Sequence, residues 1–320
     1  MSTQFSLSMF QLVVAIIGAL VASLGALVYF RRVRLERPAI GTFNSRDVMI
    51  LFTFLVVLPG LYLVLPRWGL ESLLILTFTA ALAIGFRPVV SPTVLWLGIG
   101  ALIGFNFYVG LNLLGTVPGW QVFWAETSLI TLLSAVSVAN LYVQGGMQLR
   151  HISWFALVLA VYDVIFTIVW PVSNYLVREF VGHPLFPAVG MRISYDEAII
   201  GLGDLLVYAA FTIAAVKAYG RKALRLALIL IVVFGAAMPT LSGLLINYID
   251  SRSDVIIPAQ TWFGPAAFLA YLWLRRRYGR ERTMREYLAS SDAPGRTPTP
   301  EAPSAPRATE EVPAPESVTA

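Results

Sequence analysis

Cysteine is absent from this chain of 320 residues, and charged residues make up only 13% of it. Without cysteine the protein has no disulfide, no thiolate nucleophile and no cysteine-ligated metal. The two histidines, His151 and His183, fall in predicted loops and form no metal-ligand cluster, so we expect no cofactor. The low charge, a hydrophobic fraction of 58% and a mean hydropathy of +0.74 exclude an ordinary soluble domain. They indicate a multi-span protein in a lipid bilayer.

Apolar segments long enough to cross a bilayer as helices, at about 20 residues each, recur along most of the chain. We predict an all-α polytopic membrane domain over residues 1–286. Its nine spans cover residues 9–30, 48–65, 70–86, 94–114, 122–143, 152–171, 198–216, 224–246 and 256–274. From Ser290 the chain consists mainly of Pro, Ala, Ser, Thr and Glu, which cannot bury enough apolar surface to fold. Residues 287–320 are therefore predicted to be a disordered cytoplasmic tail.

The net charge of +5 comes from basic residues at the ends of the predicted spans. One side of the predicted bundle carries most of them: Arg31, Arg32, Arg34, Arg37, Arg46, Arg87, Arg150, Lys217, Arg221, Lys222, Arg225, Arg275, Arg276, Arg277, Arg280, Arg282 and Arg285. The other side has only Arg67, Arg178, Arg192 and Arg252. The positive-inside rule then places the N-terminus outside and the C-terminus in the cytoplasm. We interpret these residues as determinants of topology and expect no nucleic-acid partner.

Two aspartates lie well inside apolar spans, Asp163 in the sixth and Asp204 in the seventh. A charged side chain at the centre of a bilayer costs about 3 kcal/mol, which argues against a packing role. The sequence from Ser194 to Glu197 fits a capping box that starts the seventh helix. Both carboxylates are then expected about 10–15 Å below the outer surface, on antiparallel neighbours. We predict that they form one site.

Paired carboxylates in a medium of low dielectric constant share a proton and titrate together. One can act as general base on a water molecule while the other, protonated, donates to a carbonyl oxygen. This is peptide-bond hydrolysis without a metal or a covalent intermediate. The sequence treats Asp163 and Asp204 as equivalent, so neither is assigned as base or acid. Gly201 and Gly203 lack side chains beside Asp204 and are expected to let another backbone approach it.

Tyr162-Asp163 and the stretch Gly201-Leu202-Gly203-Asp204 resemble the motifs of the presenilin and signal peptide peptidase family of Gly-x-Gly-Asp intramembrane aspartyl proteases. The ninth predicted span begins Pro258-Ala259-Gln260, which is similar to the family's Pro-Ala-Leu motif except that Gln260 replaces Leu. The resemblance implies nine spans and an aspartic endopeptidase with Asp163 and Asp204 as catalytic residues. It also implies substrate contacts at Tyr162, Gly201, Leu202, Gly203, Pro258, Ala259 and Gln260.

The predicted orientation, with the N-terminus outside, is similar to that of signal peptide peptidases and opposite to that of presenilins. The expected substrates are transmembrane proteins or remnant signal peptides whose N-terminus is cytoplasmic (type II). We expect a multi-pass integral protein of a prokaryotic cell membrane. Two other hypotheses remain open: an ion- or proton-coupled transporter that uses the same aspartates, and a non-catalytic scaffold of the same fold. The chain shows no internal repeat, which weighs against a transporter.

Four further polar residues lie within the predicted spans. Glu126 is near the outer end of its span, and we expect its carboxylate to reach towards the membrane interface. Asn106, Asn112 and Asn140 are expected to form hydrogen bonds between helices rather than to act in catalysis.

Overall fold

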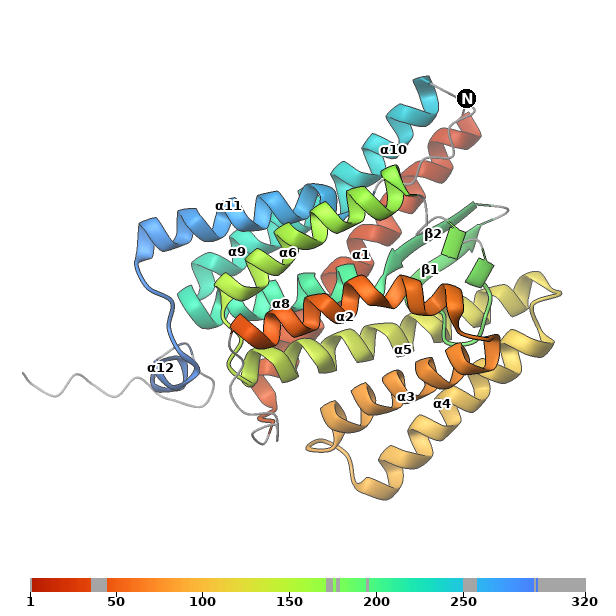
Figure 1. Cartoon of the computed structure of the whole chain (residues 1–320), viewed down its shortest axis with the longest axis horizontal. Helices are drawn as coiled ribbons and strands as arrows, with labels where there is room; N and C mark the ends of the chain where they lie inside the picture. The colour runs from red at the N-terminus through yellow and green to blue at the C-terminus, as the bar shows by residue number, and fades with distance from the viewer. Residues whose placement is uncertain are drawn as a thin grey trace, which may run out of the picture.

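The computed structural model describes residues 2–35, 45–170, 175–176, 179–193, 196–249, 258–290 and 292. Helices make up most of this part of the chain, together with one two-stranded sheet (Figure 1). The elements are α1 (Ser2–Arg32), α2 (Ser45–Val64), α3 (Arg67–Phe86), α4 (Pro92–Asn112), α5 (Val117–Gln144), α6 (Leu149–Val164), the π-helix η1 (Ile165–Val169), β1 (Ala188–Ile193), β2 (Asp196–Gly201), α8 (Leu202–Tyr219), α9 (Arg221–Leu230), the π-helix η2 (Ile231–Ala237), α10 (Met238–Ile249), α11 (Gln260–Tyr278) and α12 (Met284–Ala289).

Each of the nine predicted spans overlaps one of these helical segments. Seven segments in the described part of the chain are long and apolar enough to cross a membrane: residues 9–32, 67–86, 92–112, 117–144, 149–167, 202–219 and 221–243. The protein is therefore a mostly helical, multi-pass membrane protein. The second and ninth predicted spans correspond to α2 and α11, which are helices but are not among the seven. Arginines at 275–277 lower the hydropathy of α11.

Helix α8 lies at the centre of the bundle. All residues from Val207 to Ala218 are buried, and α8 packs against α1, α5 and α6. The small side chains of the alanine pairs at 209–210 and 214–215 allow the backbones of neighbouring helices to approach α8 closely. A helix surrounded in this way holds its first turn in a fixed position, and that turn carries Asp204.

Helices α6 and α11 run side by side, and Gly264 sets their separation (Figure 1). A Cβ atom at Gly264 would lie 2.3 Å from the backbone oxygen of Ala156 and 2.8 Å from the Cβ of Ala160. Only glycine fits at that distance. Trp154 packs on Phe268 one turn further along, with ring centroids 4.6 Å apart.

A β-hairpin interrupts the helical fold before α8, so the all-α prediction is wrong in this segment. β1 and β2 are antiparallel, with Ala188 opposite Gly201 and Ile193 opposite Asp196. The predicted start of the seventh span at residue 198 is also wrong, because residues up to Gly201 are in the strand and α8 begins at Leu202. The predicted capping box does not start the helix, since Glu197 pairs in the sheet with Arg192. Ser194 and Tyr195 lie outside the described residues.

Polar side chains of α5 hold the outer edge of β1. The hydroxyl of Thr131 donates to the oxygen of Ala188 at 3.2 Å. The hydroxyl of Ser128 donates to the oxygen of Gly190 at 3.3 Å and accepts from its N–H at 3.2 Å. These bonds satisfy backbone groups that a helical bundle would otherwise leave unpaired, which explains how a strand is stable here.

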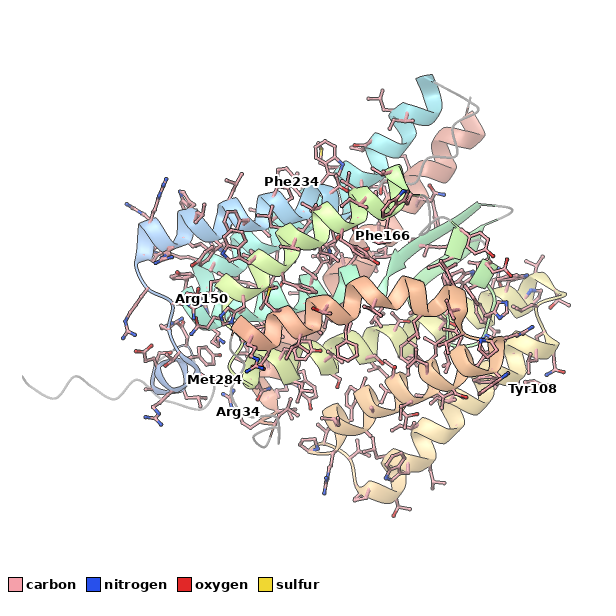
Figure 2. The ribbon with its side chains drawn as sticks, viewed as in Figure 1. Arg34, Tyr108, Arg150, Phe166, Phe234 and Met284 are labelled. Atoms are coloured by element: carbon pink, nitrogen blue, oxygen red, sulfur yellow. The ribbon has the colours of Figure 1, made fainter. Side chains whose placement is uncertain are left out.

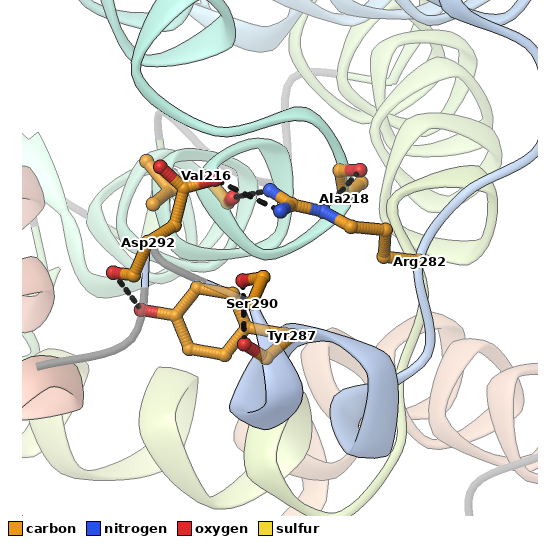
Figure 3. A network of polar contacts seen from close by, with 6 residues as sticks. All are labelled: Val216, Ala218, Arg282, Tyr287, Ser290 and Asp292. Atoms are coloured by element: carbon orange, nitrogen blue, oxygen red, sulfur yellow. Dashed lines mark hydrogen bonds and ion pairs between the residues drawn. The ribbon is translucent and has the colours of Figure 1, made fainter. Parts of the chain in front are cut away.

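Residues 281–290 and 292 form a clasp over one end of the bundle, and Figure 3 shows the contacts around Arg282 and Tyr287. Glu281 accepts hydrogen bonds from the N–H groups of Leu149 and Arg150, at 2.8 and 3.0 Å, at the start of α6. Arg282 donates to the oxygens of Val216 and Ala218 at the end of α8. An anion at a helix start and a cation at a helix end both oppose the helix dipole, so the clasp stabilises α6 and α8.

The same clasp includes α12, whose Tyr287 is fully buried against Phe30 of α1 with ring centroids 5.2 Å apart. The predicted boundary between membrane domain and tail, at residues 286 and 287, falls inside α12. Residues 293–320 of the predicted tail lie outside the described residues. Arg34, Arg150 and Met284 lie together at the clasp end, while Phe166 lies towards the other end (Figure 2).

We predict that Gly264→Ala destabilises the protein, because the added methyl group would meet the Ala156 carbonyl and force α6 and α11 apart. Overpacking of this kind lowers the free energy of unfolding by about 1–3 kcal/mol. Thermal unfolding of the purified protein in detergent measures it. The control is Gly98→Ala on α4, where an added Cβ meets nothing within 4 Å. Equal stability of the two variants would contradict the packing described for α6 and α11.

Candidate active site

The hairpin determines where Asp204 lies. β2 ends at Gly201, which is the N-cap of α8, and the N–H of Leu202 bonds to the oxygen of Pro187 at 2.9 Å. Asp204 is thus in the first turn of α8, where the helix dipole favours a carboxylate, rather than deep within a helix. A Cβ atom on Gly201 would lie 3.6 Å from Oδ2 of Asp204, so Gly201 directly adjoins the carboxylate.

Asp163 lies in the last turn of α6, just before the chain changes to the π-helix η1. Asp163 is the fourteenth residue after Leu149, and Ala218 is the fourteenth residue after Asp204. Leu149 and Ala218 are both bound by the clasp, through the adjacent residues Glu281 and Arg282. At 1.5 Å per residue, both aspartates lie about 21 Å from the clasp end of the bundle. They are close enough for their charges to interact.

A third helix, α11, contacts the aspartates through Gln260. It is the first residue of α11, it is 1% exposed, and its Nε2 donates to Oδ1 of Asp204 at 2.9 Å. The close packing at Gly264, four residues later, holds this end of α11 against α6. Helices α6, α8 and α11 therefore meet at the two carboxylates.

The other residues of the predicted site lie around this meeting point. Tyr162 is half-buried on α6 and packs on Phe166, with ring centroids 4.5 Å apart. The backbone oxygens of Pro258 and Ala259 accept the first hydrogen bonds of α11, from the N–H groups of residues 261–263. Gly203 is exposed, and a Cβ atom there would meet nothing within 4 Å. The expected close approach of backbone at Gly203 is therefore absent among the described residues.

Tyr208 is a neighbour of the aspartates that we did not single out in the sequence. It follows Asp204 by one helical turn, it is fully buried, and its hydroxyl donates to the oxygen of Gly235 at 2.9 Å. Pro239 has no N–H, so it cannot form the usual α-helical hydrogen bond to the oxygen of Gly235, which lies four residues before it in the chain. Gly235 also leaves space for the ring, since a Cβ atom there would lie 2.9 Å from Cζ of Tyr208. In the sequence, the spacing of Gly235 and Pro239 was the feature that could have indicated a side-chain donor such as Tyr208 at this point.

Two of the four predictions about other polar residues were wrong. Glu126 is 7% exposed and faces Asn106 inside the bundle instead of reaching the interface, because its side of α5 packs against α4. Asn112 is exposed and bonds within its own helix, to the oxygen of Tyr108. Asn106 and Asn140 do join different segments. Asn106 donates to Thr127 of α5, and Asn140 donates to the oxygen of Ala26 in α1.

The reactive groups in this arrangement are the two carboxyl groups of Asp163 and Asp204. Within the described ranges, no group of three or more His, Asp or Glu residues is placed to hold a metal ion. The two interacting carboxyl groups, with one amide donor between α11 and α8, are suited to sharing and moving a proton. The sequence matches no family model, and no curated protein matches it significantly.

Proposed function

We propose that the protein is an intramembrane aspartyl endopeptidase, similar to the presenilin and signal peptide peptidase family. The observation that supports this most is the meeting of three apolar segments, each with one of the family-like motifs. Asp163, Asp204 and Gln260 belong to three different helices, yet Gln260 is bonded to Asp204 and the two carboxylates interact. Placing two carboxylates together in such apolar helices is costly, and a shared-proton reaction accounts for it.

The proposed reaction uses one ionised and one protonated carboxyl group. The ionised group takes a proton from a water molecule as the water oxygen bonds to the peptide carbon. The protonated group donates its proton to the carbonyl oxygen, so a neutral tetrahedral diol forms. Its collapse breaks the C–N bond, with a proton delivered to the leaving nitrogen.

In the proposed topology nine helices span the membrane, with the N-terminus outside and the clasp end in the cytoplasm. The clustering of Arg34, Arg150, Lys217 and Arg282 at the clasp end supports this orientation. Both aspartates are about 21 Å from that end, which places them nearer to the outer face.

We further propose that the substrate binds as an extended strand beside β2. The outer edge of β1 is bonded to α5, whereas β2 has no further strand beside it in the described part of the chain. A scissile segment must unwind before its peptide bonds are accessible, because helical backbone groups are already paired. Pairing with β2 would replace those hydrogen bonds. Because β2 leads directly into α8, the paired strand would pass close to Asp204.

Asp163→Asn and Asp204→Asn are each expected to lower cleavage of a transmembrane peptide by about 10³-fold or more, since an amide cannot share the proton. The assay uses purified protein with a reporter peptide, with and without a transition-state inhibitor of aspartyl proteases. Glu126→Gln is the matched control, because it removes a buried carboxylate away from the pair. Retained cleavage in either aspartate variant would end the proposal. Lost ion flux with unchanged cleavage would point to a transporter.

Gly203→Leu is expected to lower cleavage at least tenfold while the protein stays folded. The new side chain would occupy open space beside Asp204 rather than clash with the protein. We expect the melting temperature to remain close to that of the original protein, because leucine is favourable in lipid. Gly104→Leu on α4, another open glycine, is the control. Unchanged cleavage in the Gly203 variant would show that no substrate passes there.

Substrate direction gives a further prediction, because pairing with β2 fixes the direction of the bound chain relative to the aspartates. We expect at least tenfold faster cleavage of segments whose N-terminus is cytoplasmic. One apolar segment is presented to the enzyme in both orientations, with flanking charges exchanged to set its direction. Accessibility of a tag at Ala320 reports the enzyme's own orientation independently. Equal cleavage of both forms would contradict the proposed docking.

A further inference from the structure

Gln260 makes the two aspartates chemically unequal. Its Nε2 is 2.9 Å from Oδ1 of Asp204, and the side chain is almost fully buried. In contrast, no donor in the described part of the chain is hydrogen-bonded to the carboxylate of Asp163, which faces apolar surroundings and the charge of Asp204. Leucine, the residue of the similar Pro-Ala-Leu motif, has no donor. The backbone N–H of Gly201 also bonds to Asp204, so only the side-chain part of the asymmetry belongs to this chain's own residue at position 260.

A hydrogen bond from an amide to a carboxylate favours the ionised form, and two adjacent carboxylates resist ionising together. We propose that Gln260 is a positioning residue that keeps Asp204 ionised and leaves the shared proton on Asp163. The assignment of roles rests on the proposed protease function. Asp204 is then the base that takes a proton from the attacking water, and Asp163 is the acid that donates to the substrate carbonyl oxygen.

The proton transfers balance with these roles. When the tetrahedral diol collapses, Asp204 passes the proton it received to the leaving nitrogen, and a diol hydroxyl returns a proton to Asp163. The C–N bond breaks and the pair regains its starting state. Water is the only co-reactant.

The amide oxygen of Gln260 gives the side chain a second use. This oxygen is buried and accepts no hydrogen bond from any residue that the structure describes. Since the nitrogen of the same amide faces Asp204, a water molecule beside the carboxylate can donate one proton to Asp204 and the other to this oxygen. Such a water is oriented by two fixed acceptors, which is what a nucleophile for hydrolysis requires.

Few other ionisable groups face Asp204. Helix α6 contributes Asp163 and Tyr162, and α8 itself contributes Tyr208, whose hydroxyl is bonded to Gly235. The packed segments 9–30, 165–169, 231–249 and 260–274 contain no Asp, Glu, Lys, Arg or His. Helix α5, which also packs against α8, carries Glu126, and that carboxylate accepts a hydrogen bond from Asn106 of α4. β2 carries Asp196 and Glu197 at its start, at the opposite end of the strand from α8. The backbone N–H of Gly201 also bonds to the Asp204 carboxylate, so the protonation of Asp204 depends on its burial, on Gln260, on Gly201 and on the neighbouring Asp163.

The decisive measurement is NMR titration of the protein labelled with ¹³C at the aspartate side-chain carboxyl groups. The protein has seven aspartates, and Asp→Asn substitutions assign the signals of Asp163 and Asp204. In the original protein Asp204 is expected to become protonated at lower pH than Asp163. In Gln260→Met, which keeps the length of the side chain but removes donor and acceptor, the midpoint of Asp204 should rise by about one to two pH units.

Two more variants sharpen the test. Gln260→Leu, which introduces the residue of the similar Pro-Ala-Leu motif, also removes donor and acceptor, so the midpoint of Asp204 should again rise by about one to two pH units. Gln144→Met removes another interhelical glutamine, bonded to Val33 and Asn140, and should leave both midpoints unchanged. An unchanged Asp204 midpoint in both Gln260 variants would overturn the inference.

Cleavage kinetics separate this inference from the proposed function. The acidic limb of the pH profile of kcat/KM should move to higher pH in Gln260→Met by the same one to two units. If no form of the protein cleaves peptides but the NMR midpoint shifts as expected, the protease proposal fails and the role of Gln260 in holding Asp204 ionised stands. If cleavage requires both aspartates but the midpoint does not move, Gln260 has no such role.

Discussion

In an apolar bundle every backbone N–H and carbonyl group needs a partner within the protein, and this requirement explains the irregular parts of the fold. A strand could not lie beside these helices if Ser128 and Thr131 of α5 did not bond its outer edge. Pro239 cannot donate the N–H that would bond the carbonyl of Gly235 in a regular α-helix, and the hydroxyl of Tyr208 donates to that carbonyl. In both places a side chain of one helix forms a hydrogen bond with a backbone group that is not in a regular α-helix.

Asp204 depends on the same requirement. The two strands of the hairpin satisfy each other's backbone groups, so the chain can remain extended up to Gly201. Helix α8 then begins at Leu202, and the carboxylate of Asp204 lies in the first turn of this largely buried helix. A helix that began earlier would surround Asp204 with paired backbone and leave no extended edge beside it. The strand thus gives the aspartate a favourable helix start and places extended backbone directly before it.

The sequence predicted the helices well because long apolar runs carry their own signal. It failed for residues 196–201, where six residues with a short apolar run fit a strand or a helix equally well. Their pairing partner lies in a separate segment, 188–193, and periodicity carries no information about such pairing. The contact between Gln260 and Asp204 was also missed, because 56 residues separate them and the position of α11 depends on its packing against α6 at Gly264. A polar residue opening an apolar helix was the only local sign.

The clasp has a consequence for the order in which the protein matures during synthesis. Leu149 is made 132 residues before Glu281, the residue that accepts its N–H, and Asp204 is made 56 residues before Gln260. On a ribosome that works at about 5–20 residues per second, several seconds separate the insertion of α6 from the arrival of the clasp. During that interval the start of α6, the end of α8 and the carboxylate of Asp204 all lack their final partners. The site that the two aspartates form is therefore among the last parts of the molecule to mature, after the membrane has already received most of its helices.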